Sequence, residues 1–163
     1  MVQREWVGAS PRRVGRYTLL RTLGLGAQGL VKYGVDSTTQ NAYAIKVVKV
    51  KDNVAVMSRL DTEIRAMSML HHESIVRLYE VLETEGCMFL VTELCGGGTL
   101  YDYAVTTSIT EEMARFYFCK IVNATAYMHS KGVCHLDLRL ENILLNSRGN
   151  VKVGDFGHAG IFE

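Results

Sequence analysis

The sequence predicts an α+β fold class: a five-stranded antiparallel sheet that carries one helix, followed by a helix-rich part. In the first half, short runs rich in Val, Leu, Ile, Tyr and Thr alternate with Gly-rich or polar turns, which is typical of strands. Two longer stretches repeat apolar residues every three or four positions, which is the period of a helix. The three glycines Gly96, Gly97 and Gly98 separate the strand-rich half from the helix-rich half.

The strands are expected from residue 17 onward, because residues 1–16 are polar and indicate a leader outside the folded part. The five predicted strands are Tyr17–Leu23, Leu30–Val35, Asn41–Val50, Ile75–Leu82 and Cys87–Glu93. Short turns join the first three strands, so we expect them to form an antiparallel meander.

Two helices and a small hairpin complete the expected fold. The apolar face of the first helix is Met57, Leu60, Ile64 and Met67. The second helix has Thr110 as a plausible N-cap, with two acidic residues in its first turn that suit the helix dipole. Its apolar face is Met113, Tyr117, Ile121, Ala124 and Met128. A hairpin is expected to join Ile143–Leu145 to Val151–Val153.

Composition excludes several classes of protein. The chain has 163 residues, of which 48% are hydrophobic and 21% charged, as expected for one globular domain or part of one. The formal net charge of +1 gives no reason to expect a nucleic-acid or membrane partner. No apolar run is long enough to span a bilayer. The sequence has four cysteines, Cys87, Cys95, Cys119 and Cys134, which lack metal-site spacing. Because the apolar content can build a core without disulfides and the N-terminal residues do not resemble a secretory signal, we expect reduced thiols, no disulfides and a cytoplasmic, intracellular protein.

The first motif is a glycine-rich turn between two predicted strands. Residues 24–31 read Gly-Leu-Gly-Ala-Gln-Gly-Leu-Val, and such glycines let a backbone approach phosphate oxygens closely. An ordinary glycine-rich hairpin is the alternative. A dinucleotide-binding fold is disfavoured, because a strand and not a helix follows the motif.

A lysine and a glutamate form the second pair of candidates. Lys46 lies in an apolar strand, where an unpaired charge is costly, and Glu63 lies at the border of the apolar face of the first helix. Glu63 can therefore turn inward to meet Lys46. Taken singly, each could also be a solvated surface charge.

Three polar residues near the end of the chain could support phosphate chemistry. Asp137 and Asn142 are five residues apart, and Asp155 opens an Asp-Phe-Gly triplet directly after the hairpin. An aspartate can orient a hydroxyl group and take its proton, and an asparagine oxygen can bind magnesium. By itself the triplet could be a solvated turn.

Together, in this order and on these elements, the motifs resemble the signature of eukaryotic protein kinases. The resemblance covers Tyr17 to Glu163 and is nearest the calcium/calmodulin-dependent-kinase-like group, including AMP-activated-type kinases, through residues 89–103 and 132–142. It implies an N-lobe and hinge over residues 17–95 and part of a C-lobe over residues 96–163.

The resemblance also implies ATP and Mg²⁺ as ligands. The residues implied to bind them are Leu23, Gly24, Gly26, Gly29, Val31, Ala44, Lys46, Thr92, Glu93, Cys95, Asn142 and Asp155. Lys46 would contact the α- and β-phosphates and be held by Glu63, while Asn142 and Asp155 would hold the metal. Thr92 would be a small gatekeeper behind the adenine, and residues 93–95 would form the hinge.

The implied reaction transfers the γ-phosphate of ATP to a Ser or Thr hydroxyl of a protein substrate. Asp137 would be the catalytic base, and Arg139 stands where a lysine normally contacts the γ-phosphate. Leu138 and Arg139 fit the Ser/Thr pattern better than the Tyr pattern. Leu136 replaces the arginine that pairs with a phosphorylated activation loop, so we expect no control of that kind.

Smaller departures concern the glycine loop and the peptide site. Gln28 replaces the common aromatic residue at the loop tip, and Thr99 replaces an acidic residue that often helps to bind basic peptides. Glu141 remains, so a preference for basic substrates is only weakened.

The sequence ends six residues after Gly157, which predicts an incomplete, C-terminally truncated kinase domain. We expect the second helix to expose a stripe containing Tyr117 and Ile121, which a partner would cover or through which the chain would aggregate. Two functions therefore remain open. One is a Ser/Thr kinase; the other is a nucleotide-binding or scaffold module without phosphotransfer.

Overall fold

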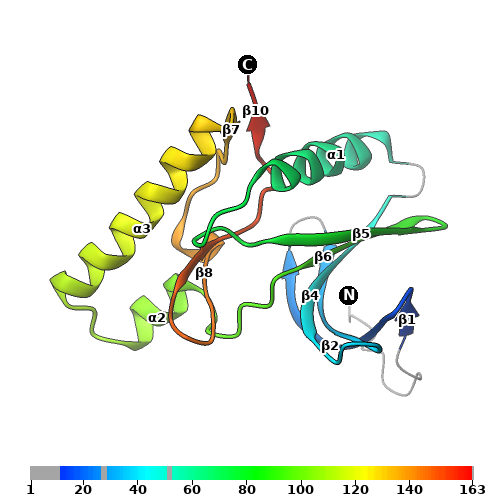
Figure 1. Cartoon of the computed structure of the whole chain (residues 1–163), viewed down its shortest axis with the longest axis horizontal. Helices are drawn as coiled ribbons and strands as arrows, with labels where there is room; N and C mark the ends of the chain where they lie inside the picture. Colours follow the sequence, from blue (N-terminus) through cyan, green and yellow to red (C-terminus); the bar gives the residue numbers. More distant parts are fainter. Residues whose placement is uncertain (1–11, 27–28, 51–52, 163) are drawn as a thin grey trace, which may run out of the picture.

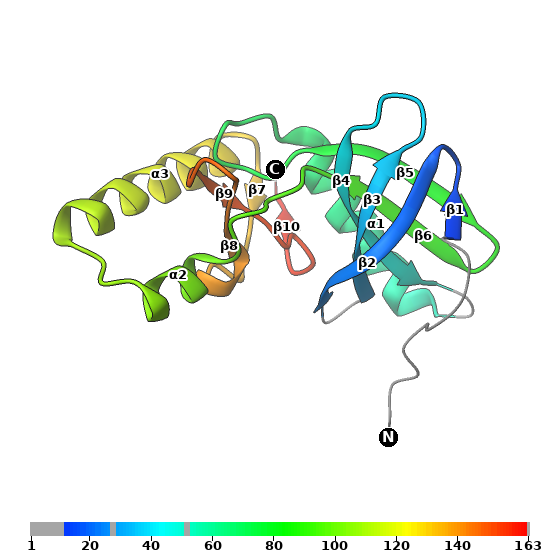
Figure 2. The same ribbon diagram turned by 90° about the horizontal axis from the view of Figure 1, so that it is seen from below.

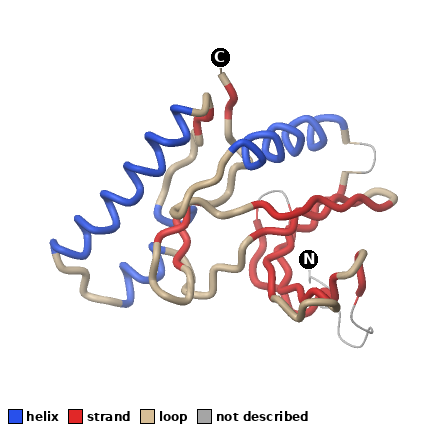
Figure 3. Tube along the Cα trace, in the orientation of Figure 1, coloured by secondary structure: helices blue, strands red, loops and turns tan. Residues whose placement is uncertain are grey.

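The structure is a computed structural model that describes residues 12–26, 29–50 and 53–162 (Figure 1). A curved sheet with one helix forms one part of the molecule, and two helices with short hairpins form the other (Figures 2 and 3). In chain order the elements are β1 (Arg12–Val14), β2 (Tyr17–Gly26), β3 (Gly29–Asp36), β4 (Ala42–Lys49), α1 (Val54–Met69), β5 (Leu78–Thr84), β6 (Cys87–Thr92), α2 (Leu100–Thr106), α3 (Glu111–Ser130), β7 (Val133–Cys134), η1 (Leu140–Asn142), β8 (Ile143–Leu145), β9 (Val151–Val153) and β10 (Gly160–Ile161).

All five predicted strands are present in one antiparallel sheet, which confirms the α+β fold class. The sheet order is β1-β2-β3-β4-β6-β5, so β4 lies near its centre. Lys46 of β4 is paired with Val31 of β3 on one side and with Leu90 of β6 on the other. Pairing with β3 and β6 therefore fixes the Lys46 backbone from both sides.

One short strand, β1, was not expected from the sequence pattern. β1 lies inside residues 1–16 and pairs with β2, which gives the sheet a sixth strand. Gly15 makes the turn with φ of +53°, a conformation that glycine adopts without steric cost, and Val14 packs beside Tyr17 and Leu19. A single apolar residue in a polar stretch produces no periodic signal, so the sequence pattern did not reveal β1.

Helix α1 packs on the sheet, and its buried face differs slightly from the predicted face. Asn53 caps it by accepting a hydrogen bond from the Val56 N–H at 3.0 Å. Of the predicted apolar positions, Leu60 and Met67 are fully buried, and Glu63 is buried with them. The helix therefore directs a carboxylate toward the sheet.

Thr110 caps helix α3 as predicted, by accepting a hydrogen bond from the Met113 N–H at 3.2 Å. Helix α2 was not predicted. A capping box begins it, in which the Thr99 side chain accepts from the Asp102 N–H and the Asp102 carboxylate accepts from the Thr99 N–H. Thr99 therefore serves as the N-cap of α2.

The prediction that Tyr117 and Ile121 form an exposed stripe is wrong. Both are partly buried against the larger core cluster, and the Tyr117 ring meets Tyr103 of α2 edge-on, with 6.0 Å between centroids. The unforeseen helix α2 supplies the contact that the sequence pattern lacked. The large apolar side chains of α3 that face solvent are instead Phe116, Phe118 and Val122. A partner that covers this face remains a prediction.

The larger core cluster joins the two parts of the molecule. It contains Met67 from α1, Met128 from α3, Val153 from β9 and the fully buried Phe156. A common core therefore holds the sheet with α1 and the helical part together. The four cysteines are free thiols. Within the described ranges, no helix is long and apolar enough to cross a membrane.

Candidate active site

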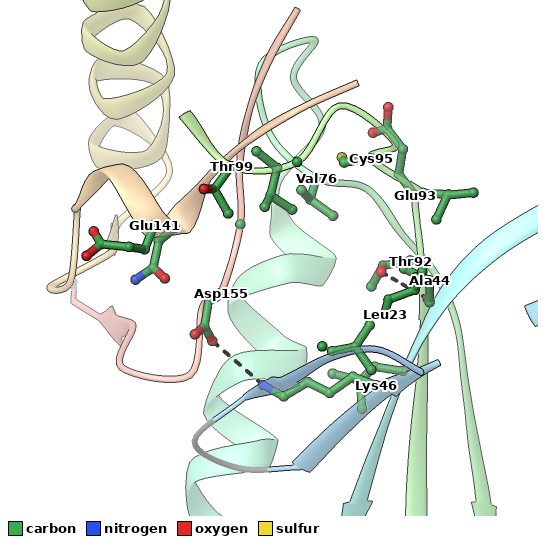
Figure 4. A pocket seen from close by; sticks show the side chains of 18 of the residues that line it. Leu23, Ala44, Lys46, Val76, Thr92, Glu93, Cys95, Thr99, Glu141 and Asp155 are labelled. Carbon is green, nitrogen blue, oxygen red and sulfur yellow. Dashed lines mark hydrogen bonds and ion pairs between the residues drawn. The ribbon is translucent and has the colours of Figure 1, made fainter. Parts of the chain in front are cut away.

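A cleft of about 490 Å³ lies between the sheet and the helical part (Figure 4). This volume is in the range of small-molecule sites. The predicted site residues that line it are Leu23, Gly24, Val31, Ala44, Lys46, Glu63, Thr92, Glu93, Cys95, Asn142 and Asp155. Gly26 and Gly29 pair with each other at the end of the β2–β3 hairpin, and Gln28 lies outside the described residues.

The ion pair expected between β4 and α1 is present. The Lys46 Nζ atom donates to both carboxylate oxygens of Glu63, at 2.6 and 2.8 Å. The side chains are only 14% and 3% exposed. Burial raises the pKa of Glu63, and the positive charge of Lys46 opposes this change by favouring the carboxylate. The pair holds the ammonium group at the inner end of the cleft.

Asp155 also lies near this ammonium group. Its Oδ1 atom is 3.8 Å from Lys46 Nζ, and Figure 4 shows the two side chains facing each other across the cleft. Asp155 adopts a positive φ of 55°, and the buried Phe156 that follows anchors this segment in the core. Strained backbone of this kind persists only where the surroundings enforce it. The tertiary structure therefore fixes the direction of the Asp155 carboxylate.

A hydrogen-bond network positions Asp137. The Asn142 Nδ2 atom donates to the Asp137 backbone oxygen and to its Oδ2 atom, both at 2.9 Å. The Asp137 N–H donates to His135 Nδ1 at 3.3 Å, and His135 Nε2 lies 2.8 Å from the Gly154 oxygen. An accepting Nδ1 requires that Nε2 carries the hydrogen and donates to Gly154. The loop is thereby tied to Gly154, which directly precedes Asp155.

The network leaves oxygen atoms that suit a hard cation. Because the NH₂ group of Asn142 is bound to Asp137, its amide oxygen is the end available to a ligand. Asn142 and Asp155 both line the cleft and supply the oxygen donors that Mg²⁺ prefers. Among the described residues, no cluster of three or more His, Cys, Asp or Glu side chains could hold a metal ion. Mg²⁺ usually binds through one or two protein oxygens together with substrate phosphates, so this donor set fits.

Arg139 is paired with a nearby glutamate. Its guanidinium donates to both carboxylate oxygens of Glu141, at 3.1 and 2.5 Å. This pairing lowers the pKa of Glu141 to about 2. Glu141 lines the cleft, and Arg139 and Asp137 are outside the lining set. The positive charge of Arg139 is therefore bound to a protein carboxylate.

The end of β6 and the segment that follows it form the rear wall of the cleft. The Thr92 hydroxyl donates to the Ala44 oxygen at 3.1 Å, which links β6 to β4 beside the cavity. The Glu93 N–H donates to the Arg77 oxygen at 2.9 Å. Burial, reinforced by the nearby Glu93 charge, raises the pKa of the Cys95 thiol to about 12. Glu93 and Cys95 both line the cleft from this wall.

Sequence reasoning missed Lys152 and His158. The Lys152 Nζ atom binds both carboxylate oxygens of Glu93, at 2.7 and 2.8 Å, and so ties the rear wall to β9. His158 lines the cleft, with Nδ1 3.9 Å from the Asp137 Oδ2 atom. Strand alternation could have placed Lys152 on one face of β9. No local signal pairs it with a residue 59 positions away.

Comparison with known proteins agrees with this geometry. Residues 17–163 match the family described as the protein kinase domain. The chain is 39% identical over 154 residues to CBL-interacting serine/threonine-protein kinase 17 of Arabidopsis thaliana, covering 93% of this chain and 36% of that protein. It is 44% identical over 150 residues to CBL-interacting protein kinase 24 of Oryza sativa subsp. japonica, covering 90% and 33%. The chain thus spans about a third of the length of these relatives. With a family match over residues 17–163, the chain belongs to the protein kinase family.

Proposed function

We propose that this protein is a Ser/Thr protein kinase that transfers the γ-phosphate of ATP to hydroxyl groups of protein substrates. One observation carries the proposal: Lys46, held by Glu63, faces Asp155 at 3.8 Å in the cleft that Asn142 also lines. This arrangement offers a cation for phosphate oxygens and oxygen atoms for a metal ion. The Arabidopsis relative named above is a serine/threonine-protein kinase, and residues 89–103 and 132–142 support placement in the calcium/calmodulin-dependent-kinase-like group.

We infer that the adenine lies between apolar side chains of the two parts of the molecule. Leu23, Val31 and Ala44 line the cleft from the sheet, and Leu144 lines it from the β8–β9 hairpin. Thr92 and residues 93–95 close the rear. Apolar surfaces with a polar edge suit a flat heterocycle. ATP is an intracellular metabolite, so we propose an intracellular location.

The phosphates would extend toward Lys46. Its ammonium group is kept in the cleft by the buried Glu63, so little reorganisation is needed when a phosphate arrives. Asn142 and Asp155 would hold Mg²⁺, which when bound neutralises charge on the phosphate oxygens.

Asp137 is the proposed catalytic base. Asn142 binds the Asp137 backbone oxygen and Oδ2, so the carboxylate is fixed while Oδ1 remains the atom that can accept the proton of the substrate hydroxyl. Phosphoryl transfer needs little covalent assistance, so orientation of the hydroxyl is the main contribution of this residue.

The test combines nucleotide binding with phosphotransfer. ATP with Mg²⁺ at 100 times its Kd should stabilise the folded chain by about 2.7 kcal/mol, and Lys46→Ala should remove most of this shift. A Ser/Thr peptide should be phosphorylated by the wild type and not by Asp137→Asn. Asp61→Asn, which changes an exposed carboxylate on α1, is the matched control.

The outcomes separate the two candidate functions. Stabilisation by ATP without any transfer would support the nucleotide-binding or scaffold module. The Arg139–Glu141 pair favours this alternative, because it binds the positive charge that would otherwise contact the γ-phosphate. Transfer that persists in Asp137→Asn would contradict the assignment of the base. A melting transition that ATP leaves unchanged would contradict the nucleotide site itself.

A further inference from the structure

A second cavity, of about 250 Å³, lies where three segments of the helical part meet. The loop after α1 contributes Glu73 and Ser74, helix α3 contributes Lys120, and the β8–β9 hairpin contributes Asn150 and Lys152. None of the cavity's lining residues is among those that line the nucleotide cleft. Neither the sequence motifs nor the proposed function assigns a role to this cavity.

Two ammonium groups line the cavity, and each is paired with a carboxylate. Lys120 Nζ is 2.7 Å from Glu73 Oε1, and Lys152 Nζ is 2.7 Å from Glu93 Oε1. Each ammonium has three N–H donors, so each keeps donors beyond those bound to its glutamate. Glu73 is 72% exposed and lies toward solvent, whereas Glu93 lines the nucleotide cleft instead. Each lysine is paired with one carboxylate, so the cavity presents ammonium N–H donors rather than a net positive charge.

Neutral side chains add further donors. Ser74 is only 3% exposed, and within the described ranges its hydroxyl makes no hydrogen bond, although its backbone N–H and oxygen are both bonded. Asn146 accepts from the N–H groups of Arg148 and Asn150 through Oδ1, at 2.9 and 3.0 Å. Its NH₂ group is therefore the end left for a ligand. Buried hydroxyls are normally hydrogen-bonded, so the Ser74 hydroxyl points to a missing partner.

We propose that this cavity is a binding site for an anionic group, either a carboxylate or a phosphate. Ammonium, amide and hydroxyl donors converge there, and charge-assisted hydrogen bonds from lysine are the strong ones for such oxygens. A cation would meet two ammonium groups. The site is connected to the nucleotide cleft through one side chain, because Lys152 also holds Glu93.

Inorganic phosphate is the first probe, added at constant ionic strength to the isotope-labelled chain. The backbone amide signals of Ser74 and Asn150 report on the cavity, because neither residue lines the nucleotide cleft. We expect saturable shifts of both signals. Lys120→Met should weaken phosphate binding about tenfold, as expected for loss of one charge-assisted hydrogen bond. Lys131→Met, which removes an exposed lysine at the C-terminus of α3, is the matched control and should leave the affinity unchanged.

A second variant and a second ligand complete the test. Ser74→Ala keeps both lysines and should also weaken binding, which guards against misfolding of a lysine variant. Short peptides with a central phosphoserine or aspartate separate the sources of the anion: tighter binding than free phosphate assigns the site to a protein partner, and equal binding assigns it to the free anion. Shifts that do not saturate, or equal affinities for Lys120→Met and Lys131→Met, would overturn the proposal. Neither result bears on ATP binding, so the proposed kinase function is tested separately.

Discussion

Replacing Lys46 with methionine should destabilise the protein strongly and in a pH-dependent way. Methionine keeps an unbranched side chain of similar length, so the packing of the stem is preserved. The change leaves the Glu63 carboxylate, which is 3% exposed, without the cation that binds both of its oxygens. Removal of one partner from a buried ion pair typically costs about 3–5 kcal/mol, because the remaining charge is uncompensated.

Protonation of Glu63 limits this cost and gives it a pH dependence. Without Lys46, burial raises the pKa of Glu63 further above its unfolded value, so the folded chain holds the proton more tightly than the unfolded chain. The free energy of unfolding then falls as pH rises from the unfolded pKa of Glu63 to its folded pKa. At about 1.4 kcal/mol per pH unit, protonating a glutamate of ordinary pKa costs about 5 kcal/mol at pH 8 and about 1 kcal/mol at pH 5. We therefore expect a loss of about 4 kcal/mol at the higher pH and about 1 kcal/mol at the lower.

Urea unfolding followed by circular dichroism at these two pH values measures the loss relative to wild type. Glu63→Gln should cost less, because Lys46 is more exposed and keeps Asp155 at 3.8 Å. The double variant Lys46→Met/Glu63→Met should recover most of the stability, because an apolar pair can replace a buried ion pair at little cost. A loss below about 1 kcal/mol that is the same at both pH values would refute the reasoning, since that is the behaviour of an exposed pair.

Three further predictions concern other parts of the structure. Burial first, and then a hydrogen bond to a carboxylate, raise the pKa of Tyr17 to about 12, so stability should fall by up to about 1.4 kcal/mol per unit between about pH 10 and pH 12; alkaline unfolding measures this, and Tyr17→Phe should abolish the dependence. Iodoacetamide should modify the exposed Cys119 well before Cys95, because burial raises the pKa of the Cys95 thiol to about 12 and keeps it protonated. Mass spectrometry of peptides measures both labelling rates, and faster labelling of Cys95 would contradict its burial. Gly34→Ala should cost about 1–3 kcal/mol, because the added methyl would lie 2.3 Å from the Cδ1 atom of the buried Ile45; an unchanged urea midpoint would show that Ile45 moves without penalty.

Local signals were sufficient for most of the elements. The five strands of the sheet, both long helices and the β8–β9 hairpin follow from apolar period, glycine turns and an N-cap, each encoded within a few residues. The meeting of Lys46 with Glu63 was accessible for the same reason: each stands in a regular element whose apolar side is evident from the sequence. Elements without a period were missed, as β1 and α2 illustrate. A three-residue strand and a seven-residue helix are too short to repeat a pattern.

The sequence by itself therefore determined the α+β class, the order of the motif-bearing elements and the pairing of Lys46 with Glu63. Only the tertiary structure decided how the other charges near the cleft are paired. Arg139 binds Glu141, Lys152 binds Glu93, and α2 covers the side of α3 that carries Tyr117. The physical reason is that local patterns arise from backbone geometry over a few residues. A charge, in contrast, takes whichever partner the packing of distant segments brings within hydrogen-bonding distance, and burial then decides how strongly the two are bound.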